Sequence, residues 1–414
     1  MLVAVSSTGH TLLEPLGHHE RRLWEPNPGA MGGRQVRRGG WYEVFIPAEI
    51  ADRGFALDED VVAAVVSATT ALARLNSTEP RLTPLNALAS ALLRSESIAS
   101  SRLEGLSISQ KRLARAAFED ADSRGKDRTA AEILGNVKAM KQAVALGVSG
   151  KEVSIDDICD IHRTLLRFSV DRKIAGVIRT KQNWIGTNPF SPIGAAYVPP
   201  PPEYVRRLLE DLCRFIARDD VAPIVQAAIA HAQFENIHPF ADGNGRVGRA
   251  LIHTVLRRGG EAINYIPPIS LVLGATQKSY VAGFGEFSGG DVSGWCDLFV
   301  AATERACHEA ERMTTAIDDR QAEWLERLGN PRRDAVVRRL IADLPGQPVI
   351  DVSAGTKVTG KSHVTVNKAL LQMEEAGIVR RLNEKKWGRA WECDELLDLV
   401  EEFEESVRRS FPGS

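Results

Sequence analysis

The clearest pattern along the chain is a series of apolar residues at helical spacing, with each run bounded by a polar or proline-containing break. The first run begins at Asp58, after which leucine, valine and alanine recur every three or four positions. The predicted helices span residues 58–75, 84–101, 128–146, 154–168, 202–217, 222–237, 246–258 and 291–315. Strand-like alternation of apolar and polar residues is scarce between them, so the sequence predicts an all-α body.

Two segments depart from the helical pattern. Residues 1–40 contain glycine and arginine without a sustained period, so we expect a loop or arm there. Residues 178–199 hold two extended runs on either side of a tract rich in glycine, asparagine, proline and serine, which predicts a hairpin. The prolines at 199–202 end this hairpin and begin the next helix.

The pattern changes again after Pro331. Helical runs at 334–344, 351–358 and 362–376 are followed by an extended hairpin at 378–391. Residues 331–393 carry 12 Lys and Arg against 7 Asp and Glu, whereas residues 394–414 carry 2 against 7. A basic segment is therefore followed by an acidic helix or tail.

The composition limits the classes of protein that the chain can represent. With 414 residues, of which 43% are apolar, it can bury the cores of two or three domains. The 52 Lys and Arg nearly balance the 54 Asp and Glu, and the net charge of −2 does not commit the whole molecule to nucleic acid or membrane. Any surface that binds a polyanion must be local.

The cysteines and the hydropathy suggest where the protein works. The five cysteines form no C-x-x-C pair, which argues against a disulfide framework and a zinc site. The N-terminus lacks a signal-peptide pattern, and no stretch approaches the ~20 apolar residues that a membrane span needs. We expect a cytoplasmic protein with no membrane partner.

Residues 238–249 carry the strongest chemical signal. The apolar helix that ends at Ile237 is broken by Pro239, Gly243 and Gly245 require a tight turn, and helical spacing resumes at Arg246. The loop therefore opens onto a helix N-terminus, where free amides and the helix dipole attract anions. Phosphate is the expected ligand.

Three kinds of side chain complete this candidate site. Asp242 stands at the mouth of the loop, where one carboxylate plus substrate phosphates can hold Mg²⁺; a helix N-cap is its alternative role. Arg246 and Arg249 lie three residues apart and share a helix face, which suits bidentate contacts to phosphate oxygens. His238 precedes the loop and is the candidate general base.

The run His-Pro-Phe-Ala-Asp-Gly-Asn-Gly-Arg at 238–246, followed by Arg249, resembles the signature of the Fic family at every specified position. The resemblance implies a Fic-type helical core that moves AMP from ATP to a Ser, Thr or Tyr hydroxyl of a protein. It makes His238 the base, Asp242 the Mg²⁺ ligand and residues 243–245 the anion cradle. The implied nucleotide site comprises Gly243, Asn244, Gly245, Arg246, Val247, Gly248 and Arg249.

Three further features resemble the same family. The hairpin at 178–199 looks like the Fic flap, which is thought to hold a target segment by main-chain pairing; an ordinary surface hairpin is the alternative. The run Ser100-Ser-Arg-Leu-Glu104-Gly is similar to the inhibitory motif of Fic proteins, in which a glutamate pairs with the arginine that the γ-phosphate needs. Tyr280 follows the motif where a family aromatic can face the adenine, although a core role is equally expected.

The segment 331–393 resembles a winged helix-turn-helix. Its candidate groove-facing residues are Ser362, His363, Thr365, Asn367 and Lys368, and residues 383–389 would form the tip of the wing. DNA is the expected partner, with protein binding or dimerisation as the alternative. Proteins of this layout often form homodimers, so a dimer is also an expectation.

These interpretations divide the chain into five predicted regions. They are an N-terminal arm at 1–45, a helical region with the inhibitory motif at 46–125, a catalytic core at 126–330, a winged helix-turn-helix at 331–393 and an acidic helix or tail at 394–414. The expected function is that of an adenylyltransferase restrained by Glu104. Two alternatives are a DNA-binding regulator whose core only senses nucleotide, and an enzyme that transfers another phosphate-linked cargo or removes AMP.

Overall fold

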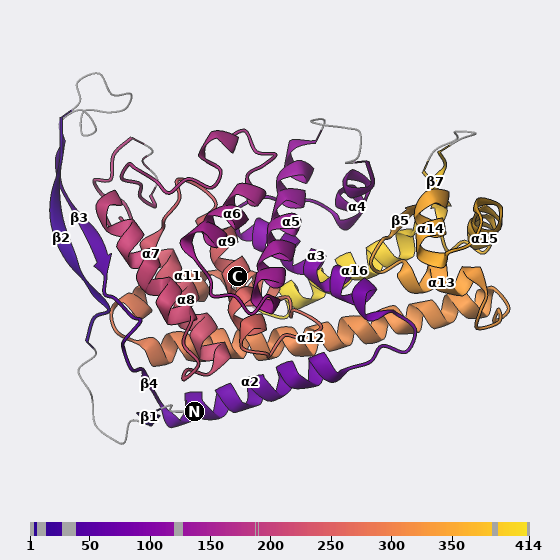
Figure 1. The fold of residues 1–414 in the computed structure, drawn as a ribbon, viewed down its shortest axis with the longest axis horizontal. Coiled ribbons are helices and arrows are strands. Elements are labelled where there is room, and N and C mark those ends of the chain that lie inside the picture. Colours follow the sequence, from indigo (N-terminus) through magenta and orange to yellow (C-terminus); the bar gives the residue numbers. More distant parts are fainter. Residues whose placement is uncertain are drawn as a thin grey trace. The chain divides into compact units, whose positions relative to one another are not determined.

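The computed structural model describes residues 4–5, 14–26, 39–119, 127–186, 188, 190–382 and 388–411 (Figure 1). It divides into two compact units. Unit 1 contains Met1–Ala68, Lys138–Glu261 and Lys278–Ala301, and unit 2 contains Thr69–Val137, Ala262–Gln277 and Ala302–Ser414. The helices α2 (Glu59–Ser77), α5 (Arg128–Val148) and α12 (Val292–Arg327) contribute residues to both units. The chain is mostly helical, which confirms the predicted fold class.

Unit 1 is built around α8 (Pro223–Ile237), which is apolar on nearly all sides and buried along almost its whole length. Its partners are α7 (Pro202–Ile216), α9 (Asn244–Arg258) and β3 (Gly40–Pro47). The amphipathic α6 (Ile155–Leu165) packs against α7 and α9. A short 3₁₀ turn at Arg172–Ile174, the strands β1 (Ala4–Val5) and β4 (Ala56–Leu57), and α11 (Gln277–Ser288) complete the unit.

An antiparallel ribbon in unit 1 overturns the expected irregular arm. Strand β2 (Gly17–Trp24) pairs with β3 from Gly17 opposite Pro47 to Trp24 opposite Gly40, and the paired arrows are plain in Figure 1. The prediction failed because β2 is rich in charged and polar residues and buries none of its side chains fully. Residues 27–38, which carry half of the glycines and arginines of residues 1–40, lie outside the described residues.

The hairpin predicted at 178–199 is reduced to a single antiparallel bridge between Ile185 and Tyr197. The Ile185 amide donates to the Tyr197 carbonyl at 2.8 Å, and the Ala196 amide donates to the Ile185 carbonyl at 2.8 Å. The remaining described residues of this segment are turns and irregular chain, because its glycine, asparagine and proline tract cannot sustain a ladder.

Unit 2 joins the helices α3 (Leu85–Leu103), α4 (Gln110–Glu119) and α10 (Ile269–Ala275) to the C-terminal elements. These elements are α13 (Val336–Asp343), β5 (Val349–Asp351), α14 (Val352–Thr359), α15 (His363–Glu375), β6 (Arg380–Arg381), β7 (Ala390–Glu392) and α16 (Asp394–Arg409). The three strands form an antiparallel sheet in the order β5–β7–β6. The helices predicted at 334–344, 351–358 and 362–376 are therefore present, whereas 383–387 of the predicted wing tip lie outside the described residues.

No helix in the described part of the chain is both long enough and apolar enough to cross a membrane. The five cysteines are free thiols, as the absence of cysteine pairs in the sequence predicts.

Candidate active site

The loop between α8 and α9 in unit 1 begins with an unusual backbone conformation. His238 is the C-cap of α8 and adopts the left-handed conformation, with φ 49° and ψ 59°. Among the described residues only Asn330 is another non-glycine residue with positive φ, and such a conformation costs on the order of 1 kcal/mol or more. The His238 amide donates to the Phe234 carbonyl at 2.9 Å, which ends the helix at this point.

The His238 side chain lies near the surface and beside a carboxylate. Its imidazole is 18% exposed, so a bound substrate can reach it. The Nδ1 atom of His238 lies 4.0 Å from Oε2 of Glu235. A reactive imidazole requires this combination of access and fixed backbone.

The interior of the loop is closed by Asn244. Phe240 is fully buried, and its amide donates to Oδ1 of Asn244 at 2.8 Å. Nδ2 of Asn244 donates back to the Phe240 carbonyl at 2.8 Å, and Nδ2 of Asn183 donates to the same carbonyl at 3.0 Å. The Asn244 side chain, predicted as a nucleotide contact, therefore serves the loop itself in this structure.

His162 on α6 supports the loop from outside its sequence. Its Nδ1 accepts a hydrogen bond from the Gly176 amide at 3.0 Å, which leaves Nε2 protonated to donate to the Asp242 carbonyl at 3.0 Å. The imidazole stacks on Phe240 with ring centroids 3.8 Å apart. Burial lowers the pKa of His162 to about 4, so this imidazole is neutral and holds the loop. Sequence reasoning did not identify it, because a lone histidine on an apolar helix face gives no such signal.

Gly243 starts α9 and leaves its first amides accessible. Its φ of 81° favours glycine, and a Cβ there would lie 3.0 Å from Cδ2 of Leu165. As the N-cap residue it provides no side-chain hydrogen bond to the first turn of α9. The helix N-terminus can therefore accept an anion, as the sequence predicts.

Two arginines on α9 are buried next to this N-terminus. Arg246 is 5% exposed and Arg249 is 2% exposed. Nη2 of Arg246 donates to Oδ2 of Asp242 at 3.1 Å, whereas its buried Nε has no hydrogen-bond partner among the described residues. An unpartnered buried donor is costly, and an anionic oxygen would satisfy it.

The carboxylate of Asp242 fits the expected role of a metal ligand. Its side chain is 53% exposed at the mouth of the loop, and carboxylate oxygen is the ligand type that Mg²⁺ prefers. Its pairing with Arg246 also shows that the N-cap alternative is not used, because Gly243 is the N-cap of α9.

Three other predicted nucleotide contacts are packing residues in this structure. Val247 is fully buried in the core. Gly248 faces α8 so closely that a Cβ would lie 2.6 Å from Oε1 of Glu235 and 3.0 Å from Cδ1 of Phe234. Tyr280 is 3% exposed, and its hydroxyl lies 2.8 Å from Nε2 of His231 in an aromatic cluster. The burial of Tyr280 favours the core role, which was one of the two roles expected for it.

Glu104 belongs to unit 2 and is the C-cap of α3. Its amide donates to the Ser101 carbonyl at 3.1 Å, and the following Gly105 has φ 79°. The predicted motif is therefore placed at the end of a helix, as the sequence implies.

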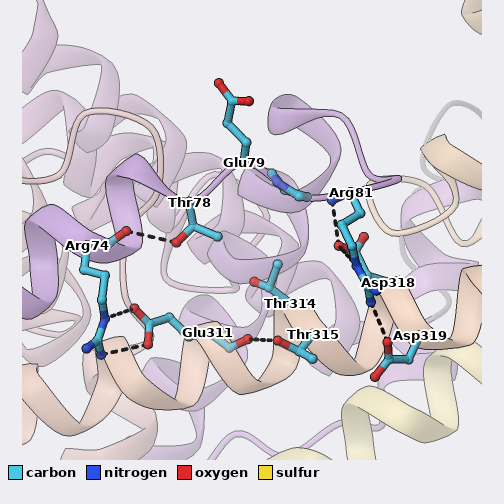
Figure 2. Close-up of a pocket in the computed structure, with 10 residues that line it drawn as sticks. Arg74, Thr78, Glu79, Arg81, Glu311, Thr314, Thr315, Asp318 and Asp319 are labelled. Carbon is cyan, nitrogen blue, oxygen red and sulfur yellow. Dashed lines mark hydrogen bonds and ion pairs between the residues drawn. The ribbon is translucent and has the colours of Figure 1, made fainter.

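A hollow of about 500 Å³ in unit 2 lies between α12 and the chain that follows α2 (Figure 2). Five of the six charged side chains that line it form ion pairs with one another, and the sixth is Glu79. Arg74 forms a bidentate pair with Glu311, and Arg81 pairs with Asp318 and Asp319. These contacts leave the hollow without the reactive groups that the α8–α9 loop carries.

Comparison with known proteins finds similarity to one family in stretches that belong to both units. Residues 152–256 match the Fic/DOC family, and residues 62–145 match the Fic/DOC family N-terminal region. The crystal structure of a Fic family protein from Desulfovibrio desulfuricans G20 shares the fold, with a TM-score of 0.51 and 20% identity over 82% of this chain and 97% of that one.

Curated relatives match a shorter part of the chain. The protein adenylyltransferase fic-1 of Caenorhabditis elegans is 34% identical over 166 residues, which are 39% of this chain and 30% of the relative. The protein adenylyltransferase Fic of Drosophila ananassae is 34% identical over 152 residues, which are 36% of this chain and 28% of the relative. The matched region thus spans less than a third of either relative. The similarity to the Fic/DOC family thus covers residues 152–256, and the similarity to the N-terminal region of that family covers residues 62–145.

Proposed function

We propose that the protein is an adenylyltransferase that transfers AMP from ATP to a Ser, Thr or Tyr hydroxyl of a protein. The observation that carries the proposal is a partly exposed imidazole, His238, held next to an uncapped helix N-terminus that is followed by two buried arginines. The names of the C. elegans and Drosophila relatives support the same activity for the matched region.

In the proposed reaction the target hydroxyl oxygen attacks the α-phosphorus of ATP. The bond from the α-phosphorus to the bridging oxygen breaks, and diphosphate leaves. His238 accepts the hydroxyl proton as the new oxygen–phosphorus bond forms. The amides at the start of α9, together with Arg246 and Arg249, bind the phosphate oxygens. ATP and the protein that carries the hydroxyl are the proposed partners.

Mg²⁺ is the proposed metal, with Asp242 as its ligand from this chain. When bound, the ion would neutralise charge on the phosphates of ATP. In this structure Asp242 pairs with Arg246. When the nucleotide and the metal bind, the Asp242 carboxylate would contact the metal and the Arg246 guanidinium would contact the phosphates.

Glu104 is the proposed inhibitor, on the resemblance of its segment to the Fic inhibitory motif. A glutamate that pairs with Arg249 would occupy the donors that the γ-phosphate needs and leave ATP in an unproductive position. Replacement of Glu104 by glycine would then raise the transfer rate.

A second candidate function is DNA binding by the segment 331–393. It is favoured by the exposure of Lys361, Ser362, His363, Val364 and Thr365 around the start of α15, where Val364 is 74% exposed. Solvent-facing polar and basic residues at the start of a helix can enter a major groove. Loss of salt-dependent DNA affinity in a Lys361→Glu, Lys368→Glu variant would support this function, and unchanged affinity would contradict it.

If the catalytic core only senses nucleotide, nucleotide should still regulate DNA binding by the segment 331–393 in a His238→Ala variant.

The proposed compartment is the cytoplasm, because all five cysteines are free thiols. A homodimer stays a prediction.

The proposed activity is tested with two radiolabels. The Glu104→Gly variant is incubated with a cell lysate and Mg²⁺, with either α-³²P-ATP or γ-³²P-ATP. Adenylylation predicts labelled protein from the α label only. Label from the γ position would show phosphorylation instead, and mass spectrometry of the modified peptide identifies any other cargo by its added mass.

A further inference from the structure

We infer that Arg179 is a positioning residue for the proposed transfer, because it ties both ends of the segment 178–200 to the main chain of His238. This inference rests on the proposed function. Arg179 is buried, with 6% of its surface exposed. It lies outside the signature run 238–249 and near the start of the predicted flap at 178–199.

The guanidinium of Arg179 donates only to main-chain carbonyls. Nε donates to the His238 carbonyl at 2.8 Å, and Nη2 reaches the carbonyls of Pro200 and of Ile237, the latter at 3.4 Å. Nη1 donates to the Lys181 carbonyl at 3.3 Å. The backbone amide of Arg179 adds a bond to the Pro239 carbonyl at 3.0 Å.

The cation lacks an acidic partner. Among the described residues no carboxylate lies within ion-pair distance of Arg179, and burial lowers the pKa of its guanidinium to about 10. Burial of an unpaired cation is unfavourable by several kcal/mol, so the carbonyl contacts must offset it. Carbonyls at the C-terminal end of α8 can stabilise the buried cation, because the helix dipole places partial negative charge there.

These contacts connect the flap to the base. The carbonyls of Lys181 and Pro200 belong to the two ends of the flap, and those of Ile237 and His238 belong to the end of α8. One planar guanidinium fixes all of them in a single geometry, which a lysine ammonium cannot do. A target segment held by the flap would thereby be placed at a set distance from the His238 imidazole.

The test compares Arg179→Lys and Arg179→Gln in the Glu104→Gly background, where the proposed inhibition is removed. Arg94→Lys is the matched control. Arg94 is a second arginine whose guanidinium donates to main-chain carbonyls, those of Pro345 at 2.8 Å and Gly346 at 3.3 Å, and its pKa is also lowered to about 10 by burial. It belongs to unit 2, whereas the α8–α9 loop belongs to unit 1.

We expect kcat to fall roughly 10- to 100-fold in both Arg179 variants, since a displacement of about 1 Å at a reacting group can have this effect. KM for ATP should stay within about twofold, because Arg179 contacts no proposed phosphate ligand. Arg94→Lys should lower the unfolding temperature and leave kcat unchanged. An unchanged kcat in the Arg179 variants, with only the unfolding temperature lowered, would overturn the inference.

A second readout does not depend on activity. Hydrogen exchange measured by mass spectrometry should show faster exchange at the C-terminal end of α8, up to His238, in Arg179→Lys and not in Arg94→Lys. Unchanged protection of this end of α8 would refute the positioning role. If the Glu104→Gly parent transfers no label, the proposed function fails, while the exchange experiment still decides whether Arg179 holds the end of α8.

Discussion

The carbonyl of Asp242 is held by His162, an imidazole 80 residues earlier in the chain, and this contact can be tested without changing the loop. In His162→Phe the ring can still stack on Phe240, but the bonds to Asp242 and Gly176 are lost. We expect the free energy of unfolding to fall by roughly 1–3 kcal/mol, together with weaker binding of ATP with Mg²⁺. Urea unfolding and ATP titration measure both effects.

The control for this substitution is His18→Phe, whose side chain is 65% exposed in the ribbon. It should change the free energy of unfolding by less than about 0.5 kcal/mol. Equal stability of His162→Phe and the unsubstituted protein would show that the His162 bonds contribute nothing to the loop.

At the residue scale, the sequence was informative where the chemistry is contiguous. His238, Asp242, Arg246 and Arg249 could be placed because a break, a glycine turn and a resumed helix follow one another directly. His162 and Arg179 could not, since their contacts exist only after the fold brings distant segments to the loop. The nucleotide contacts expected of Asn244 and Gly248 stay predictions, and the structure adds a local role for each: Asn244 bonds to Phe240 and Gly248 packs against α8.

At the element scale, α8 and α9 depend on a glycine for their close approach. A Cβ at Gly248 would meet Glu235, Phe234 and His231 between 2.6 and 3.1 Å, so Gly248→Ala should lower the free energy of unfolding by roughly 1–3 kcal/mol. Gly285, in α11, has no atom within 4 Å of the same position and is exposed. Gly285→Ala should therefore be stabilising by about 0.5–1 kcal/mol.

Chemical denaturation of the two alanine variants compares them directly. Opposite signs would support the packing role of Gly248. Stabilisation by both substitutions would mean that α8 and α9 have room for a methyl group.

The helix α16 carries a buried acid that makes unit 2 sensitive to pH. Glu404 is 2% exposed and accepts hydrogen bonds from Ser95 at 2.6 Å and from Gln110 at 2.8 Å. Burial raises the pKa of Glu404 to about 7. The charge of Arg102 lowers this pKa and the charge of Glu401 raises it, while the charge of Glu404 raises the pKa of Arg94. Between pH 4.5 and 7 the folded protein thus holds a proton that the unfolded chain releases.

The free energy of unfolding should consequently decrease as the pH rises through this window, and level off above it. The pKa difference corresponds to about 3 kcal/mol as an upper bound. Glu404→Gln should remove this pH dependence. The free energy of unfolding of the variant, relative to that of the unsubstituted protein, should therefore increase from pH 4.5 to pH 8. Urea unfolding at several pH values measures it, and parallel curves for the two proteins would contradict the assignment.

The longer helices were predicted because their apolar periodicity is strong, whereas α4, α10, α11 and the β2–β3 ribbon were not predicted. Most predicted helices begin and end within a few residues of the observed ones, although α12 continues to Arg327, well past the predicted end at 315. Strand β2 alone looks polar, but the run Trp41–Ile46 in β3 is rich in aromatic and β-branched residues and was a usable signal. The flap was predicted as two strands, and its described residues form one antiparallel bridge, between Ile185 and Tyr197.

At the scale of the whole molecule, each unit is assembled from three separate stretches of chain. Domain boundaries at single positions, such as those predicted at 125 and 330, do not describe these two units, because α2, α5 and α12 each contribute residues to both. Helical periodicity records which face of a helix is buried, but not which partner buries it. The five predicted regions stay predictions.

In the proposed reaction the Fic-type loop transfers AMP, with His238 as the base and Glu104 as the inhibitor. The most direct measurement is transfer of label from α-³²P-ATP with Mg²⁺ by the unsubstituted protein, by Glu104→Gly, and by Glu104→Gly combined with His238→Ala. We predict weak labelling by the first, strong labelling by the second and none by the third. If ATP binds to all three and none transfers label, the account of the protein as an adenylyltransferase is contradicted.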